Sequence, residues 1–258
     1  MPASTQVRDT LYNDPIWSAY AIADLQPDFD PYCTWYVGGS GQDLGVALLF
    51  TALSIPTLFT VGEPTAVAAA VAKVPLPEEV YITIREFHMA HLTGLYDFSA
   101  DTRPMWRMTL ADEALLPARS TGSVTRLGEA DGPRLQALFA GGGEYAPDAF
   151  DPYQLQNGVF VGVEMADGSL AAAGGTHIVD WTSGVAAIGN MYTREPQRGR
   201  GYGRAILHAI VTILRAGNVQ NIVLNVDQRN ERARRIYEAY GFSCHCPYLE
   251  GIGELRHA

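Results

Sequence analysis

The stretch of this sequence with the clearest chemical potential is Gln197–Ala205, which reads QRGRGYGRA. Three glycines alternate with arginines and a tyrosine, after an apolar strand-like run and before an apolar helix-like run. Backbone amides at a helix N-terminus bind anions when no side chain stands in the way, and arginine adds charge that suits phosphate. The stretch therefore predicts a phosphate site, with a plain surface turn rich in glycine and arginine as the alternative.

Two common nucleotide motifs fit this stretch poorly. The dinucleotide fingerprint has two residues between its second and third glycines, whereas Gly199, Gly201 and Gly203 are separated by one residue each. Asp227 follows at a suitable distance for that motif, but too little chain remains for the rest of its sheet. A P-loop is excluded because no Gly-Lys-Ser/Thr ends the loop.

A second pattern lies in Asn230–Phe242, which reads NERARRIYEAYGF. Asn230 and Tyr237 are seven residues apart, close to two helical turns, so they share a helix face with the small Ala233 between them. This arrangement predicts a groove beside the helix. The plain alternatives are an N-cap for Asn230 and a core aromatic for Tyr237, while Tyr240 is the better candidate for packing alone.

The elements that must position these residues follow from hydrophobic periodicity and turn signals. The second half is predicted to contain strands at Val124–Leu127, Val159–Met165, Ala171–Val179, Val185–Thr193 and Asn221–Val226, and helices at Asp131–Ala140, Arg204–Arg215 and Glu231–Tyr240. The first half is predicted to contain a helix at residues 14–25, strands at Cys33–Val37, Leu44–Ala52, Thr57–Val61, Val80–Ile84 and Met105–Leu110, and a helix at Glu63–Lys73. Strands alternating with helices predict a mixed α/β (α+β) fold. A looser segment at 111–123 predicts two domains, 1–118 and 119–258.

Composition narrows the class of protein. The chain is 47% hydrophobic with a formal net charge of −10, which argues for a packed core and against a nucleic-acid partner. Three cysteines cannot form a disulfide framework, the start lacks an apolar signal core, and the apolar run Val46–Val61 is short and interrupted by Pro56. These features predict a cytoplasmic protein with no membrane partner, and they leave the oligomeric state open, a dimer included.

Both patterns resemble the GNAT (GCN5-related) N-acetyltransferase superfamily. Arg198–Gly203 fits its R/Q-x-x-G-x-G/A pattern, and Asn230–Phe242 fits N-x-x-A-x-x-x-Y-x-x-x-G-F. The preceding strand and Pro196 fit the same layout. The resemblance covers roughly Val124–Pro247, and it is nearest to the C-terminal half of the glycine acyltransferases. It implies a GNAT acyl-CoA acyltransferase fold in the C-terminal half.

The resemblance also bears on the N-terminal half. Strand Thr57–Val61, a turn and a helix repeat the order of strand, loop and helix without the glycines and arginines. This order favours a degenerate second copy that has lost cofactor binding, with an unrelated cap domain as the alternative.

The resemblance implies specific roles. Acetyl-CoA would be the co-substrate, with no metal, and the acceptor would be a primary amine on a small molecule or peptide. The pyrophosphate would be held by the loop residues Arg198, Gly199, Arg200, Gly201, Tyr202, Gly203 and Arg204. The pantetheine arm would pair with the backbone of Met191, Tyr192 and Thr193, with Asn230 also contacting the cofactor.

Tyr237 is the expected catalytic acid. Attack of an amine on a thioester expels a thiolate, and the ordinary pKa values of a thiol (~8.5) and a phenol (~10) make proton donation only mildly uphill. A backbone amide of the Met191–Thr193 strand would stabilise the thioester oxygen. A CoA-binding sensor without transfer, or transfer of a longer acyl group, are the alternatives.

The sequence does not single out a general base, and a water relay could serve instead. The acids and polar residues in range are Glu144, Asp148, Asp151, His177, Asp180 and Asn190. Cys244-His245-Cys246 lacks a second pair at metal-binding spacing, and His88 and His91 are expected to be core or surface residues.

Overall fold

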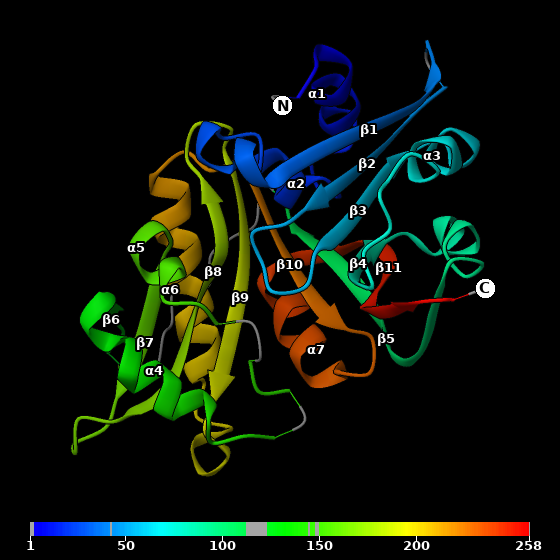
Figure 1. Ribbon diagram of the computed structural model, residues 1–258. Helices are drawn as coiled ribbons and strands as arrows, with labels where there is room; N and C mark the ends of the chain where they lie inside the picture. The colour runs from blue at the N-terminus through cyan, green and yellow to red at the C-terminus, as the bar shows by residue number, and fades with distance from the viewer. Residues whose placement is uncertain (1–2, 42, 112–122, 144, 148–149, 258) are drawn as a thin grey trace. The chain divides into compact units, whose positions relative to one another are not determined.

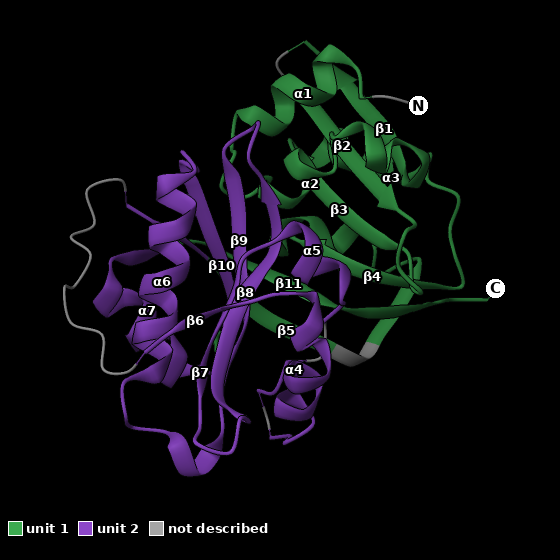
Figure 2. Cartoon of the chain, turned by 90° about the vertical axis from the view of Figure 1, so that its left-hand side faces the viewer, with its two compact units in different colours: residues 1–107, 227–229, 244–258 green, residues 108–226, 230–243 purple. Residues whose placement is uncertain are grey.

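The computed structural model describes residues 3–41, 43–111, 123–143, 145–147 and 150–257, and the side chains of residues 99–101 are also left undescribed. The chain forms two compact units. Unit 1 comprises residues 1–107, 227–229 and 244–258, and unit 2 comprises residues 108–226 and 230–243 (Figure 2). The expected boundary between residues 118 and 119 lies outside the described residues and stays a prediction.

Unit 1 is a mixed sheet with short helices. Its helices are α1 (Thr5–Tyr12), α2 (Ala19–Ala23) and α3 (Pro64–Val71), with 3-10 turns η1 (Pro27–Tyr32) and η2 (Glu86–His91). Its strands are β1 (Cys33–Ser40), β2 (Asp43–Phe50), β3 (Thr57–Gly62), β4 (Glu79–Ile84), most of β5 (Tyr96–Leu110) and most of β11 (Phe242–Leu255). The strand order is β1-β2-β3-β4-β11-β5, with β3 and β4 parallel and β4 antiparallel to β11.

Unit 2 holds the residues that the sequence singled out. Its strands are β6 (Thr125–Leu127), β7 (Phe160–Glu164), β8 (Leu170–Asp180), β9 (Val185–Thr193) and β10 (Asn221–Asp227, whose last residue is assigned to unit 1). Its helices are α4 (Gly132–Phe139), α5 (Tyr153–Asn157), α6 (Tyr202–Ala216) and α7 (Glu231–Tyr240), with 3-10 turns η3 (Glu129–Asp131) and η4 (Glu195–Gln197). Strands β6 to β9 are antiparallel neighbours, and β10 pairs parallel to β9 after the crossover through α6.

The two faces of the unit 2 sheet carry different helices, as Figures 1 and 2 show. A Cβ on Gly174 of β8 would lie 2.8 Å from Ile206 of α6. A Cβ on the next residue, Gly175, would lie 2.5 Å from the ring of Phe160, which packs in a cluster with apolar residues of α4 and α5. Because successive strand residues face opposite sides, α6 covers one face and α4 with α5 covers the other.

The termini of α6 and α7 follow from local chemistry. Gly201 precedes α6 at φ +81°, a left-handed conformation that glycine adopts without strain, and Gly217 follows the helix. Asn230 caps α7 by accepting from the Ala233 amide at 3.1 Å, and Gly241 ends it at φ +109°. These are the start and stop signals expected for helices, which explains why the sequence located both closely.

The predicted elements and the structure differ at five places. The expected helix at residues 14–25 is reduced to α2: Asp14 accepts from the Trp17 amide at 3.0 Å, but the residues from there to Ser18 form turns and the helix begins only at Ala19. Helix α1, helix α5 and strand β11 were not predicted, and β5 begins at Tyr96, nine residues before the expected Met105. The run Val46–Val61 does form the end of one strand, a bend and most of another, as expected.

Both units contain the same arrangement of a strand, a crossover helix and a parallel strand. In unit 1, β3 and β4 pair from Thr57↔Tyr81 to Phe59↔Thr83, with α3 between them. In unit 2, β9 and β10 pair from Val185↔Asn221 to Ile188↔Leu224, with α6 between them. In each case the first strand continues beyond the paired segment. The N-terminal half therefore fits the expected second copy.

Candidate functional site

Strands β9 and β10 pair only over their first four residues. Beyond Ile188 and Leu224, the described register between them ends, while β9 continues through residues 189–193. On its other side, β9 contains a bulge: Asn190 and Met191 stand opposite the single residue Gly174 of β8, and Asn190 has φ +53°. Such bulges bend a strand and end its pairing. The strand edge at 189–193 is therefore turned away from β10 and can pair with an extended ligand.

Polar contacts fix the bulge from the α4–α5 face. The side-chain amide of Asn190, which is only 6% exposed, donates to Gln154 Oε1 of α5 at 2.8 Å. The Tyr192 hydroxyl donates to the Gly142 carbonyl at 2.7 Å, and its ring meets Phe139 edge-on. Since side chains hold the strand in place, its main-chain groups at the free edge are preorganised.

The three strand residues singled out by the sequence lie on this segment. Met191 is half-buried and its sulfur lies towards α6, where a Cβ on Gly174 would come within 2.3 Å of it. Tyr192 is buried in the α4 core, so its side chain serves packing. The Thr193 carbonyl accepts from Arg198 Nε at 3.2 Å.

The glycine loop leads directly into α6. Gly199 and Gly201 both have left-handed backbones, at φ +82° and +81°. Gly201 offers no side-chain cap, and the first helical bond runs from the Ala205 amide to the Gly201 carbonyl at 3.1 Å. The amides of residues 202–204 thus have no helical acceptor and point outward at the positive end of a 15-residue helix. This is an anion-binding geometry.

Neither the backbone conformation nor the packing of the folded chain requires a glycine at position 203. Its φ is not positive, it lies inside α6, and a Cβ there would meet no heavy atom within 4 Å. Glycine costs about 0.8–1.0 kcal/mol relative to alanine within a helix. A glycine with open space around it, beside unused amides, fits close approach of a ligand such as a pyrophosphate.

Cationic side chains surround the loop. Arg198, Arg200 and Arg204 are all exposed. Arg198 lies nearest to the strand, since it contacts the Thr193 carbonyl and lies 3.9 Å from Glu195. An exposed pair of this kind contributes little to stability, so the charge of Arg198 is available to an anion.

Helix α7 carries the second pattern. Asn230 is its N-cap, so its side-chain oxygen is engaged with the Ala233 amide. Tyr237 is 8% exposed, its ring meets Phe242 edge-on, and burial raises its pKa to about 12. Tyr240 is fully packed and its hydroxyl lies 3.1 Å from His208 Nδ1. The Tyr237 hydroxyl therefore stays protonated at neutral pH, so in a proton transfer it can act as the acid and not as the base.

In unit 1 the equivalent helix N-terminus is occupied by the protein itself. Glu63 precedes α3, and its carboxylate accepts from the Ala66 amide at 3.0 Å and from the Thr65 hydroxyl. The hydrogen bond from Thr65, followed by that from Ala66, lowers the pKa of Glu63 below its ordinary value. A resident carboxylate takes the place where a phosphate would bind.

The strand edge in unit 1 is also engaged. The indole Nε1 of Trp17 donates to the Thr60 carbonyl of β3 at 2.9 Å. Burial lowers the pKa of His88 to about 4, so this imidazole is neutral; its Nε2 lies 3.3 Å from the Gly62 carbonyl and its Nδ1 lies 2.9 Å from the Thr60 hydroxyl. Because a carbonyl can only accept, Nε2 carries the proton. The unit 1 strand thus lacks the open edge of β9.

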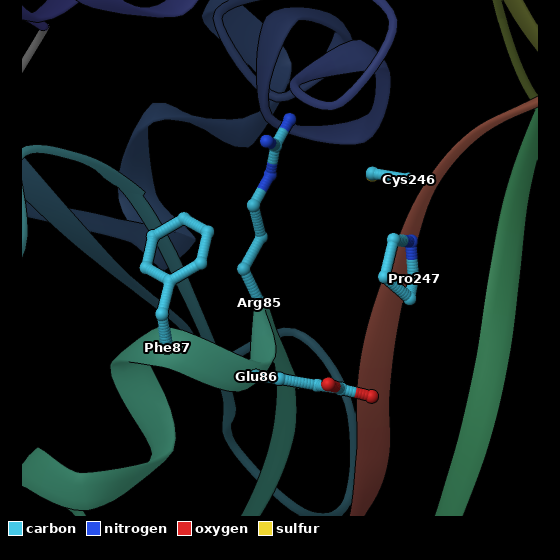
Figure 3. A pocket seen from close by; sticks show the side chains of 5 residues that line it. All are labelled: Arg85, Glu86, Phe87, Cys246 and Pro247. Carbon is cyan, nitrogen blue, oxygen red and sulfur yellow. The ribbon is translucent and has the colours of Figure 1, made fainter.

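Unit 1 contains a separate cavity of about 420 Å³, lined by Arg85, Glu86, Phe87, Cys246 and Pro247 (Figure 3). Arg85 extends from the end of β4 and forms an ion pair with Asp14. Burial, the largest influence, raises the pKa of Asp14, but hydrogen bonds from His245 and the Trp17 amide, with the charges of His245 and Arg85, lower it below 3.8 overall. The cation of this cavity is already paired, so the cavity does not repeat the anion site of unit 2.

The candidate general bases named from the sequence have different environments in the structure. Glu144 and Asp148 lie outside the described residues. Asp151 accepts from the Tyr153 amide at 2.7 Å, and Asp180 is buried and accepts from the Thr182 amide at 2.9 Å, so both stabilise turns. His177 lies against Gly189 at the start of the bulge, a placement that sequence reasoning missed. The one sequence signal for it was glycine followed by asparagine inside a strand, which is typical of bulges.

The described residues contain neither a metal-binding cluster nor a membrane-spanning helix. No group of three or more His, Cys, Asp or Glu side chains is arranged to hold a metal ion, Cys244-His245-Cys246 included. None of the described helices is both long enough and apolar enough to span a membrane.

One family model matches part of the chain, and solved structures are similar to the fold. Residues 134–242 match the model of the acetyltransferase (GNAT) family. No curated protein sequence matches the chain significantly. Among solved structures, a GNAT-family protein from Novosphingobium aromaticivorans is similar with a TM-score of 0.64 at 20% identity, covering 94% of this chain and 97% of that one.

Two further structures extend the likeness over both units. A GCN5-related N-acetyltransferase from Kribbella flavida has a TM-score of 0.61 at 15% identity, covering 93% of this chain and 99% of that one. A tandem GNAT protein from the clavulanic acid biosynthesis pathway has a TM-score of 0.56 at 15% identity, covering 100% and 98%. At these identities the likeness establishes the fold, and the tandem protein fits a chain built from two copies.

Proposed function

Because residues 134–242 belong to the acetyltransferase (GNAT) family, we propose that this protein transfers the acetyl group of acetyl-CoA directly to a primary amine. The chain is an acyltransferase of the GNAT type, and the acetyl donor and amine acceptor are the proposed refinements. The observation that carries the proposal is that unit 2 contains both an uncapped helix N-terminus at Gly201 and an open strand edge at 189–193. One feature suits a pyrophosphate and the other suits an amide-containing arm.

The binding roles follow from these two features. The amides of residues 199–204 donate to the pyrophosphate oxygens, and Arg198, Arg200 and Arg204 supply charge around them. The main chain of Met191, Tyr192 and Thr193 pairs with the amides of the pantetheine arm, as an added strand does. Asn230 caps α7, so its proposed contact with the cofactor is made by the part of its side chain not used by the cap.

The proposed chemical roles use one group on β9 and one on α7. A backbone amide of the Met191–Thr193 segment donates to the thioester oxygen as negative charge develops on it. Tyr237 donates a proton to the departing sulfur. With its pKa near 12, the transfer to an ordinary thiolate is uphill by about 5 kcal/mol at 1.36 kcal/mol per unit. A sulfur desolvated in the same buried place is more basic, which narrows this gap.

A direct assay tests the proposal. The purified chain is incubated with acetyl-CoA and a broad panel of primary amines, and free thiol is measured together with the acetylated product. Amine-dependent thiol release that saturates in both substrates supports transfer. Tight CoA binding without release for any amine would instead favour a CoA-binding sensor. Faster release from a longer acyl-CoA than from acetyl-CoA would overturn the acetyl preference and leave the acyltransferase in place.

We expect this reaction in the cytoplasm, where acetyl-CoA and reduced thiols are both present. The low cysteine content supports that setting.

A further inference from the structure

The imidazole of His177 occupies the space next to Gly189 at the opening between β9 and β10. A Cβ on Gly189 would lie 2.1 Å from His177 Nε2 and 2.4 Å from both Cδ2 and Cε1. Gly189 has no positive φ, so its backbone does not call for glycine. It is the His177 ring that leaves no room for a side chain at residue 189. The ring lies with its Nε2 close to the backbone of the strand.

That position is the start of the proposed acyl site. Ile188 is the last residue of β9 that pairs with β10, and Asn190 begins the bulge. Gly189 lies between them. His177 Nε2 therefore lies against a residue that is two to four positions along the strand from the amides of Met191–Thr193, which are proposed to bind the thioester oxygen.

His177 also lies on the face opposite α6. Gly189 pairs directly with Gly175, whose Cβ would meet Phe160 of the α4–α5 core. Directly paired residues of antiparallel strands share a face, so the space above Gly189 that the imidazole fills belongs to the α4–α5 face. The phosphate site is at the N-terminus of α6. An arm that starts there and passes the open edge of β9 delivers its thioester towards the face that carries His177.

The chemistry of the acceptor calls for a base at this point. A primary amine is protonated near neutral pH and has no lone pair to attack with until it loses a proton. Histidine is the side chain whose charge changes nearest neutral pH, which suits it to accept that proton. The described acids Asp151 and Asp180 are both engaged with backbone amides in turns.

We propose that His177 is the general base of the transfer, an inference that rests on the proposed function. His177 Nε2 takes one proton from the acceptor ammonium and passes it to water. The amine nitrogen then bonds to the thioester carbon, and the C–S bond breaks as the carbonyl re-forms. The nitrogen loses its second proton to water, and the sulfur receives a proton from Tyr237, which is reprotonated by water. One proton is released per acetyl group transferred.

The test uses His177→Gln in the full chain, with the primary amine that gives the fastest thiol release in the wild type. We expect kcat/KM to fall by about 100-fold or more, with the Kd for CoA unchanged. Hydroxylamine, which is largely neutral at pH 7.5, needs no base to release its lone pair. Its rate with His177→Gln should stay close to that of the wild type. A purely structural role for His177 would lower the rate with both acceptors equally.

Two further variants keep the test decisive. His208→Gln removes another half-buried histidine of unit 2, one that contacts Tyr240, and should leave the ratio of the two acceptor rates unchanged. Gly189→Ala displaces the imidazole while keeping it in the chain, so it should lower the rate with the amine and spare hydroxylamine, even where His177→Gln does not fold. If the wild type transfers to the amine and His177→Gln does so equally well, this inference is wrong and the proposed function stands. If the wild type transfers to no acceptor while binding CoA, the proposed function itself fails.

Discussion

Replacing Gly203 by glutamate should weaken CoA binding by about 100-fold while leaving the fold intact. A Cβ at this position meets no heavy atom within 4 Å, and the backbone is helical, so the side chain can be accommodated. Glycine is about 0.8–1.0 kcal/mol less favourable than alanine inside a helix, and glutamate is close to alanine on that scale. A carboxylate in the first turn adds about 0.3–1 kcal/mol. The free energy of unfolding should therefore stay constant or rise by about 1 kcal/mol.

The loss of affinity has a separate cause. The new carboxylate would stand where the outward amides of residues 202–204 are proposed to hold a pyrophosphate. Two like charges 4 Å apart repel by about 4 kcal/mol at an effective dielectric constant of 20. Salt at 0.15 M screens part of this repulsion. A residual of about 2.7 kcal/mol corresponds to a loss of about 100-fold in Kd.

Calorimetric titration with CoA measures the affinity, and urea unfolding of the same samples measures the stability. Gly203→Gln is the matched control, because it adds the same bulk without the charge and should weaken binding less than glutamate does. Gly203→Ala should bind CoA well, since the loop pattern of the family admits alanine there. If Gly203→Glu is folded and binds CoA within a factor of about three of the wild type, the anion site at α6 is refuted.

Further outcomes follow from other residues. Gly201→Ala should lower the free energy of unfolding by about 1–2 kcal/mol, because its φ of +81° is left-handed, and denaturant titration measures this loss. Tyr237→Phe should reduce kcat at saturating amine far more than it changes the Kd for CoA; an unchanged kcat would rule out its acid role. Titration should show one CoA bound per chain, since unit 1 fills its own helix terminus and strand edge; a second site of comparable affinity would contradict this. The lowered pKa of Asp14 contributes stability that is fully present above about pH 3.8 and lost as the pH falls through the folded pKa; Asp14→Asn should therefore show a weaker dependence of stability on pH in acid than the wild type.

The sequence predicted those elements of the proposed site that depend on neighbours along the chain. The bounds of β9 and α7 agree with the prediction, because apolar runs, an asparagine cap and terminal glycines are all local signals. The glycine loop, for which we propose phosphate binding, could be located for the same reason. Its glycines and arginines lie within seven consecutive residues.

Contacts between residues far apart in the chain could not be predicted from the sequence. The imidazole of His177 meets Gly189 only because a bulge shifts the register of two strands, and no pattern states that register. Strand β11 was missed because Cys244, Pro247 and four charged or polar residues (Ser243, His245, Glu250 and Glu254) interrupt its alternation. Its place beside β4 is decided by pairing across about 170 residues of chain.

The two copies of the strand–helix–strand arrangement differ in how they satisfy the same backbone groups. In unit 1 the Ala66 amide at the start of α3 donates to the carboxylate of Glu63, and carbonyls of β3 accept from the side chains of Trp17 and His88. These contacts stabilise unit 1 without any ligand. In unit 2 the start of α6 has no side-chain cap and β9 has an open edge, so those groups depend on water or a ligand. A ligand that satisfies them binds only the folded state and stabilises it by about 2.7 kcal/mol at 100 times its Kd. The chain thus combines one copy whose polar groups are satisfied internally with one whose polar groups are open to the CoA that we propose, and the two copies differ in this respect at Glu63 and Gly201.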